Sequence, residues 1–183
     1  MRVAIYAGHG GTDPGAVANG MQEKNLNLTI STLATELLQG RGYTVYNNRT
    51  ADVIRSITHD ANKANNNQVD ALVEIHFNSN VGAPGSGSEA YISHREIYPS
   101  RTLAHVLLAR IQALGFRDRG VKVRRNLRGA DAFGILRMTT VPAVLLECAF
   151  INNPQDMAKL DVLTMAAAIT DSLCEVLNGP RRP

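Results

Sequence analysis

The chain has 183 residues, a formal net charge of +3, and 44% hydrophobic and 19% charged residues. This composition is typical of one folded domain and excludes an intrinsically disordered chain. No run of eighteen apolar residues is present, so we expect no membrane span. We also expect no signal peptide, because Arg2 is followed by a strand and a histidine loop. The two cysteines, Cys148 and Cys174, lack CxxC spacing and are expected to be buried free thiols.

The hydrophobic pattern predicts strands that alternate with helices. Strands are expected at residues 3–7, 43–46, 71–77, 89–93, 133–136 and 142–148. Helices are expected at 23–39, from an N-cap at Asp52 to about residue 64, and at 100–114 and 162–177. This order indicates a single α/β domain with a mostly parallel, twisted sheet and helices on both faces, of the phosphorylase/hydrolase-like kind. The domain is expected to span residues 1–177, and residues 178–183 to form a tail or linker stub.

Ionisable residues lie where three apolar strands end. His9 follows the first strand between glycines, His76 lies in the strand 71–77, and Glu147 ends the sequence PAVLLE. Glu23 begins the helix that returns from the first strand. The carboxyl ends of parallel strands meet at one edge of a sheet, where ligands bind. Two histidines and one carboxylate with a vacant position are typical ligands of a catalytic zinc ion, and a further carboxylate can carry the proton.

Each of these residues also has a purely structural interpretation. A histidine at a strand end is often only hydrogen bonded, Glu23 can favour the positive end of its helix dipole, and Glu147 can pair with a nearby arginine. The glycine-rich loop at residues 8–15 can cradle a phosphate, but it lacks the motif of a P-loop or of a dinucleotide site. Convergence of all four residues on one edge favours the metal site.

Other polar residues near these strand ends are weaker candidates. Glu74 precedes His76 by two residues and shares its face of the strand, so it can orient a ligand or be a satisfied buried carboxylate. Asn78 and Glu89 are comparable supporting candidates. Surface or structural roles are expected for the remaining histidines, His59 (placed in the middle of a helix), His94 and His105.

Six cations crowd one segment opposed only by Asp118: Arg117, Arg119, Lys122, Arg124, Arg125 and Arg128. Such a segment is either a solvated surface or a contact for an anionic polymer. We do not expect nucleic acid to be the partner, because no aromatic residue is interleaved for base stacking.

The blocks AGHGGTDPGA, QEKNLNL, EIHFNS, GSEAY, DRGVK and LRMTTVPAVLLECAFINN occur in this order and cover the chain to about Leu177. In them the chain resembles the zinc-dependent N-acetylmuramoyl-L-alanine amidases of the amidase-3 type, found in bacterial cell-wall hydrolases and phage endolysins. The resemblance implies one zinc ion per chain held by His9, Glu23 and His76, with Glu147 as the catalytic carboxylate. It also implies cleavage of the amide between the lactyl group of N-acetylmuramic acid and L-alanine in peptidoglycan.

Two features depart from many members of that family. Many have Ser at the position of Glu74, and the Glu form is more similar to the phage lysins. Many also carry a separate wall-binding domain. We expect a monomer that is made in the cytoplasm and acts on the cell wall, as a lysin released at lysis or as a catalytic domain of a secreted hydrolase. The alternatives are a non-catalytic peptidoglycan- or anion-binding module and a zinc exopeptidase on a related fold.

Overall fold

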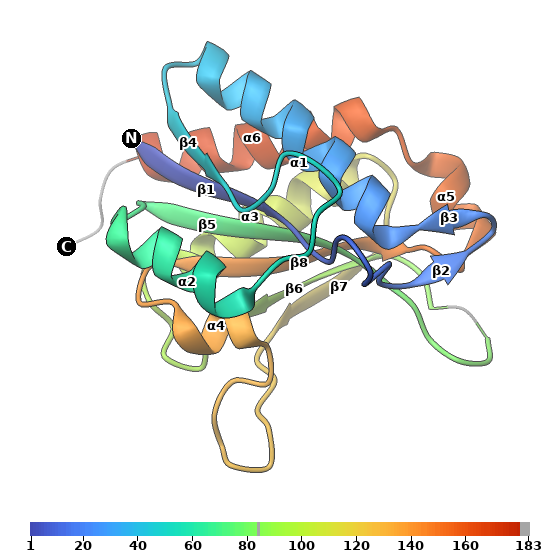
Figure 1. Cartoon of the computed structure of the whole chain (residues 1–183). Coiled ribbons are helices and arrows are strands. Elements are labelled where there is room, and N and C mark those ends of the chain that lie inside the picture. The colour runs from blue at the N-terminus through green and yellow to red at the C-terminus, as the bar shows by residue number, and fades with distance from the viewer. Residues whose placement is uncertain (84, 180–183) are drawn as a thin grey trace.

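The computed structural model describes residues 1–83 and 85–179, and these residues form a three-layer α/β domain (Figure 1). A six-stranded sheet with the order β4-β1-β5-β8-β6-β7 lies at its centre. Its strands are β1 (Arg2–Ala7), β4 (Thr44–Asn47), β5 (Ala71–Asn78), β6 (Ser88–Ile92), β7 (Asp118–Lys122) and β8 (Ala143–Phe150). Neighbouring strands are parallel except β6 and β8, which are antiparallel. The predicted fold class is confirmed.

Helices cover both faces of the sheet. On one face lie α1 (Glu23–Gly40), α3 (Ser100–Ala113) and α6 (Val162–Asn178), and on the other α2 (Ile57–Asn66) and α4 (Gly134–Met138). Successive side chains of β1 point to opposite faces, so Val3 and Ile5 enter the first core while Ala4 and Tyr6 enter the second. Outside the sheet, β2 (Val17–Ala18) and β3 (Met21–Gln22) form a hairpin, and α5 (Pro154–Lys159) follows β8. None of the described helices is long and apolar enough to span a membrane.

The second helix begins later than the sequence predicts. It starts at Ile57, and its N-cap is Ser56, whose hydroxyl accepts a hydrogen bond from the backbone of His59. The expected cap, Asp52, instead accepts a hydrogen bond from the backbone of Gly11 at 2.8 Å and pairs with Lys24. A tertiary contact therefore replaces the cap, and residues 53 and 54 lie in an exposed loop.

One further prediction about elements is wrong, and one strand was not predicted. The strand expected at 133–136 is the short helix α4, because a run of four apolar residues carries no periodicity that separates a helix from a strand. The basic segment contains a strand, β7, that the sequence pattern did not indicate.

Cys174 is only partly buried, since it lies on α6 beside Arg41, whereas Cys148 is the expected buried free thiol. Residue 84 of the loop 81–88 and residues 180–183 of the expected tail lie outside the described residues.

Both ends of the described chain lie at the amino ends of the parallel strands. Met1 precedes β1, and it lines a cavity of about 310 Å³ together with Val176 and Leu177 of α6. Residues that precede β5 and β8, Asp70 and Pro142, line the same cavity. The opposite edge, where the parallel strands β1, β5 and β8 end, carries the residues considered next.

Candidate metal centre

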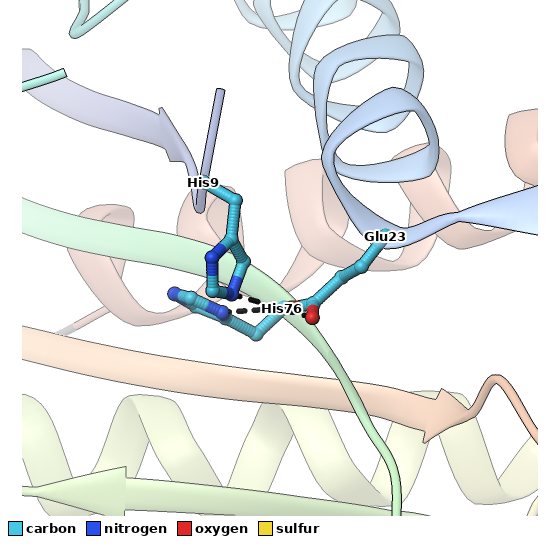
Figure 2. A group of neighbouring side chains, drawn as sticks. All are labelled: His9, Glu23 and His76. Atoms are coloured by element: carbon cyan, nitrogen blue, oxygen red, sulfur yellow. Dashed lines mark hydrogen bonds and ion pairs between the residues drawn. The ribbon is translucent and has the colours of Figure 1, made fainter. Parts of the chain in front are cut away.

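Three side chains from separate elements converge at the carboxyl ends of β1 and β5 (Figure 2). His9 follows β1, Glu23 is the first residue of α1, and His76 lies near the end of β5. Each offers one nitrogen or oxygen, and these three atoms lie within 4.8 Å of one another. Of the described residues, these form the one group of three His, Cys, Asp or Glu side chains that is close enough to hold a metal ion.

Glu23 is held from several directions. Its Oε2 accepts a hydrogen bond from the backbone of Ala16 at 2.8 Å, and its Oε1 accepts one from the backbone of Phe77 at 3.0 Å. The side chain is buried. Burial opposes its ionisation, but hydrogen bonds from His76 and His9 outweigh burial and lower the pKa of Glu23. Glu23 is therefore a fixed, ionised ligand candidate.

The two imidazole rings present different nitrogens to Glu23. Nε2 of His9 lies 3.3 Å from Oε2 of Glu23, and Nδ1 of His76 lies 2.9 Å from Oε1. The outer nitrogens also face carboxylates: Nδ1 of His9 is hydrogen bonded to Asp13 at 2.8 Å, and Nε2 of His76 lies 3.5 Å from Glu74. Sequence reasoning missed Asp13, although a carboxylate four residues after His9 in the glycine loop was the available signal.

The glycines of the loop allow the backbone to pack directly against these rings. A Cβ atom on Gly15, whose φ is +65°, would lie 2.5 Å from Oε2 of Glu23 and 2.6 Å from Cδ2 of His9. A Cβ on Gly8 would lie 2.3 Å from the ring of His76. Since protein side chains fill the space beside these glycines, the loop does not form the phosphate cradle considered as an alternative.

Glu147 lies beside this group on β8. It is the register partner of His76 on one side and of Glu89 on the other. Its Oε2 is buried and has no hydrogen-bond partner in the described part of the chain. Burial, reinforced by the negative charges of Glu23 and Glu89, raises the pKa of Glu147 to about 7 against the opposing charge of His76. The arginine pair considered for Glu147 is not found among the described residues.

The cations near this site pair with Glu89 instead. Oε2 of Glu89 accepts hydrogen bonds from Arg119 at 2.7 Å and Lys122 at 2.5 Å, and its Oε1 accepts one from Asn78 at 2.9 Å. Two of the six cations in the basic segment are therefore internal partners of one buried carboxylate. Arg117, Arg124, Arg125 and Arg128 remain exposed.

The other three histidines lie away from the metal site. His94 is hydrogen bonded to the buried Asp131. His59 lies in the first turn of α2, not in the middle of a helix, and His105 lies on α3; both are exposed. Their structural or surface setting agrees with the sequence analysis.

The donor set fits a metal ion. Two imidazole nitrogens and one carboxylate oxygen suit a divalent transition metal, and three protein ligands leave a coordination position open. The neighbouring carboxyl group of Glu147 has no competing partner among residues 1–83 and 85–179. A metal-assisted hydrolytic site requires such a set of ligands with a carboxyl group beside it.

Residues 3–178 match the family described as N-acetylmuramoyl-L-alanine amidase, and the chain belongs to that family. It is 39% identical to Bacillus subtilis YqiI over 86% of this chain and 74% of that protein. It is 36% identical to B. subtilis N-acetylmuramoyl-L-alanine amidase LytC over 86% of this chain but only 31% of LytC. The solved catalytic domain of CwlV, an amidase from Bacillus (Paenibacillus) polymyxa var. colistinus, matches 97% of this chain and 98% of that domain, with a TM-score of 0.84 and 29% identity. The resemblance noted from the sequence is confirmed.

Proposed function

We propose that this chain is a zinc-dependent amidase domain that hydrolyses the bond between the lactyl group of N-acetylmuramic acid and L-alanine of the peptidoglycan stem peptide. The observation that carries the proposal is the cluster of His9, Glu23 and His76 beside Glu147, whose buried Oε2 has no hydrogen-bond partner in the part of the chain that the structure describes. Family membership supports the choice of bond. The site of action is then the bacterial cell wall.

Zinc is the metal that best suits two histidines and one glutamate with an open position. One ion per chain would be held by Nε2 of His9, Nδ1 of His76 and the carboxylate of Glu23. When bound, zinc supplies a Lewis acid for the scissile carbonyl and lowers the pKa of water. Asp13 holds the outer nitrogen of His9, so the ring keeps Nε2 directed toward the cluster.

Glu147 is the proposed proton carrier. In its ionised form it accepts a proton from the water that attacks the amide carbonyl. It then donates that proton to the nitrogen of L-alanine as the carbon–nitrogen bond breaks, since the amine cannot leave as an anion. A carboxyl group with a pKa near 7 suits both steps at neutral pH. The products are the lactyl carboxylate and a free peptide amine.

A pocket of about 210 Å³ adjoins the cluster and offers space for the substrate. His9 and His76 line one side, while Ile57, Phe133 and Leu145 supply an apolar wall. Asp13, Arg55 and Glu74 also line this pocket, so it combines the apolar wall with charged groups that can bind the polar parts of the substrate.

Two other functions were considered. A non-catalytic wall-binding module does not require a partnerless buried carboxyl group beside three ligands. A zinc exopeptidase commonly requires two metal ions, whereas the described residues contain a single cluster of possible ligands. The presence of Glu147 beside one three-ligand cluster favours the amidase.

The test is digestion of purified muropeptides, with the products identified by mass spectrometry. We expect a newly formed lactyl carboxylate and a new amino terminus on L-alanine. We also expect loss of activity with a chelator and recovery of activity with zinc. Cleavage of a peptide bond within the stem would support the exopeptidase instead. Binding without cleavage by the zinc-loaded protein would support the binding module.

A further inference from the structure

Glu74, the residue that precedes His76 by two on β5, is buried against the outer side of the His76 ring. Its side chain is 3% exposed, and its Oε2 lies 3.5 Å from Nε2 of His76, an ion-pair distance. The other nitrogen of the same ring faces Glu23. The imidazole of His76 therefore lies between two carboxylates, one on each nitrogen.

A guanidinium group fixes the second oxygen of Glu74. The Arg55 side chain donates a hydrogen bond to Oε1 of Glu74 at 2.5 Å. It also donates one from Nε to Oδ2 of Asp60 at 2.9 Å. Asp60 is almost fully buried and accepts a further hydrogen bond from Asn48 at 3.2 Å. With Oε1 held in this way, Oε2 remains directed at His76.

The charges of this network do not cancel among its own members. Two buried carboxylates share the single positive charge of Arg55, so one unit of negative charge remains beside the His76 ring. Two further ionisable groups among the described residues contact Asp60: the exposed His59 lies 3.7 Å from its carboxylate, and the hydroxyl of the buried Tyr6 donates a hydrogen bond to its backbone carbonyl at 2.9 Å. The surplus charge thus lies next to the nitrogen of His76 that points away from Glu23.

We propose that Glu74, held by Arg55, is a positioning residue that fixes His76 with Nδ1 directed at the metal. An imidazole that binds a metal through Nδ1 carries its proton on Nε2, and a carboxylate at Nε2 stabilises that tautomer and strengthens the other nitrogen as a donor. This inference rests on the proposed zinc function and assigns a role to a buried ion pair that the function itself does not require.

The test compares zinc affinity among variants at one pH, by competition with a chromogenic chelator. Loss of a group that supports a ligand typically costs about 10- to 100-fold in metal affinity. We expect a loss in that range for Glu74→Gln, which keeps the size of the side chain and removes its charge. We also expect a change in the visible absorption of the cobalt(II)-substituted variant, because that spectrum reports ligand geometry.

Glu89→Gln is the matched control. It removes an equally buried carboxylate with two cationic partners on a strand of the same sheet, and Glu89 does not contact His76. We expect the zinc affinity of this variant to stay within a few-fold of wild type even if its melting temperature falls. Glu74→Ser is the second variant in case the change to Gln prevents folding, because many members of the family have Ser at this position and Arg55 keeps its pair with Asp60.

Zinc affinity of Glu74→Gln within a few-fold of wild type would overturn the positioning role, whatever its melting temperature. Equal weakening in Glu89→Gln, or failure of both Glu74 variants to fold, would assign Glu74 to stability and overturn the role as well. A wild-type chain that binds no zinc would overturn the zinc mechanism along with it. If the wild type binds zinc tightly and Glu74→Gln binds it with the same affinity, this inference alone would be overturned, and the proposed zinc function would stand.

Discussion

His76 on β5 and Glu147 on β8 are direct register partners on neighbouring parallel strands. Neighbouring strands are about 4.8 Å apart, so the sheet itself sets the separation between a ligand candidate and the proposed proton carrier. The same register places Glu89 of β6 on the other side of Glu147. Backbone pairing, more than any loop, fixes the geometry of the proposed reaction.

Glu147→Gln tests the proton carrier. This change keeps the size of the side chain and removes its proton exchange, which is worth about 10²- to 10⁴-fold. We expect the rate of muropeptide cleavage to decrease by a factor in that range, while zinc content and melting temperature stay near those of the wild type. His9→Ala and His76→Ala are the comparison variants, and they should lose zinc and activity together. Turnover of Glu147→Gln within a few-fold of wild type would remove Glu147 from the mechanism.

Zinc binding should release protons. Burial opposes protonation of His76, but hydrogen bonds to Glu23 and Glu74 outweigh burial and raise its pKa to about 10, and the pKa of His9 is raised as well. The metal-free ring of His76 is therefore protonated near pH 7, and the raised pKa of His9 favours its protonated form, whereas a metal ligand must be neutral. We expect about one to two protons released per zinc ion, measured by calorimetry in buffers of different ionisation enthalpy. An enthalpy that does not depend on the buffer would contradict this state of the metal-free site.

Gly15→Ala tests the close packing of the loop against the ligands. At φ +65° an alanine is strained by about 1–3 kcal/mol, and its Cβ would also overlap Glu23 and His9. Gly20→Ala is the control, because Gly20 has φ +74° and no atom within 4 Å of the added Cβ. We expect both variants to lose stability in urea titrations, and Gly15→Ala alone to lose zinc affinity. Equal zinc affinity in the two variants would show that the contact is unimportant.

Glu89 should contribute to stability at neutral pH and lose that contribution in acid. Burial raises its pKa, but hydrogen bonds from Lys122, Arg119 and Tyr91 outweigh burial, and the net pKa is lowered. Such a group stabilises the fold fully above its unfolded pKa of about 4.3, and this stability is lost as pH falls through the folded value. We expect the urea midpoint of the wild type to fall more steeply below about pH 5 than that of Glu89→Gln. Parallel curves would assign the acid sensitivity to other carboxylates.

The loop between β7 and α4 projects from the body of the domain and carries the exposed Arg125 and Arg128 (Figure 1). If this loop contacts an anionic wall polymer, the double variant Arg125→Gln/Arg128→Gln should have lower activity on whole walls. Its activity on a small neutral muropeptide should be the same as that of the wild type. The difference should shrink as salt rises, because the screening length is about 8 Å at physiological ionic strength. Arg101→Gln, which removes an exposed cation paired with Glu96, is the control. Equal effects on both substrates would show that the loop is only a solvated surface and does not contact the wall polymer.

The sequence predicted the sheet and its principal helices because long segments such as 23–39 and 162–177 carry a clear helical period. The group formed by His9, Glu23 and His76 followed from one rule, that parallel strands end at a common edge. The rule worked because these residues lie directly at element ends. Side-chain contacts at that edge, such as the Asp13 pair, needed the folded loop.

The errors have local physical causes. The expected cap at Asp52 failed because Lys24, distant in sequence, binds its carboxylate. The sequence pattern did not indicate strand β7, because Arg119 and Lys122 belong to a run of cations that is typical of a solvent-exposed surface. In the structure both side chains bind the buried Glu89. Sequence periodicity does not reveal a buried anion on a neighbouring strand, so the pattern could not separate internal cations from surface ones.

The shared cavity beneath Met1 and Leu177 has a consequence for larger architectures. Both described ends lie at the amino ends of the strands, so a module joined to either end would be attached on the side opposite the proposed site. The edge that carries the proposed site would then face away from the attachment points. A module fused to either end is therefore expected to leave the pocket beside His9 and His76 accessible.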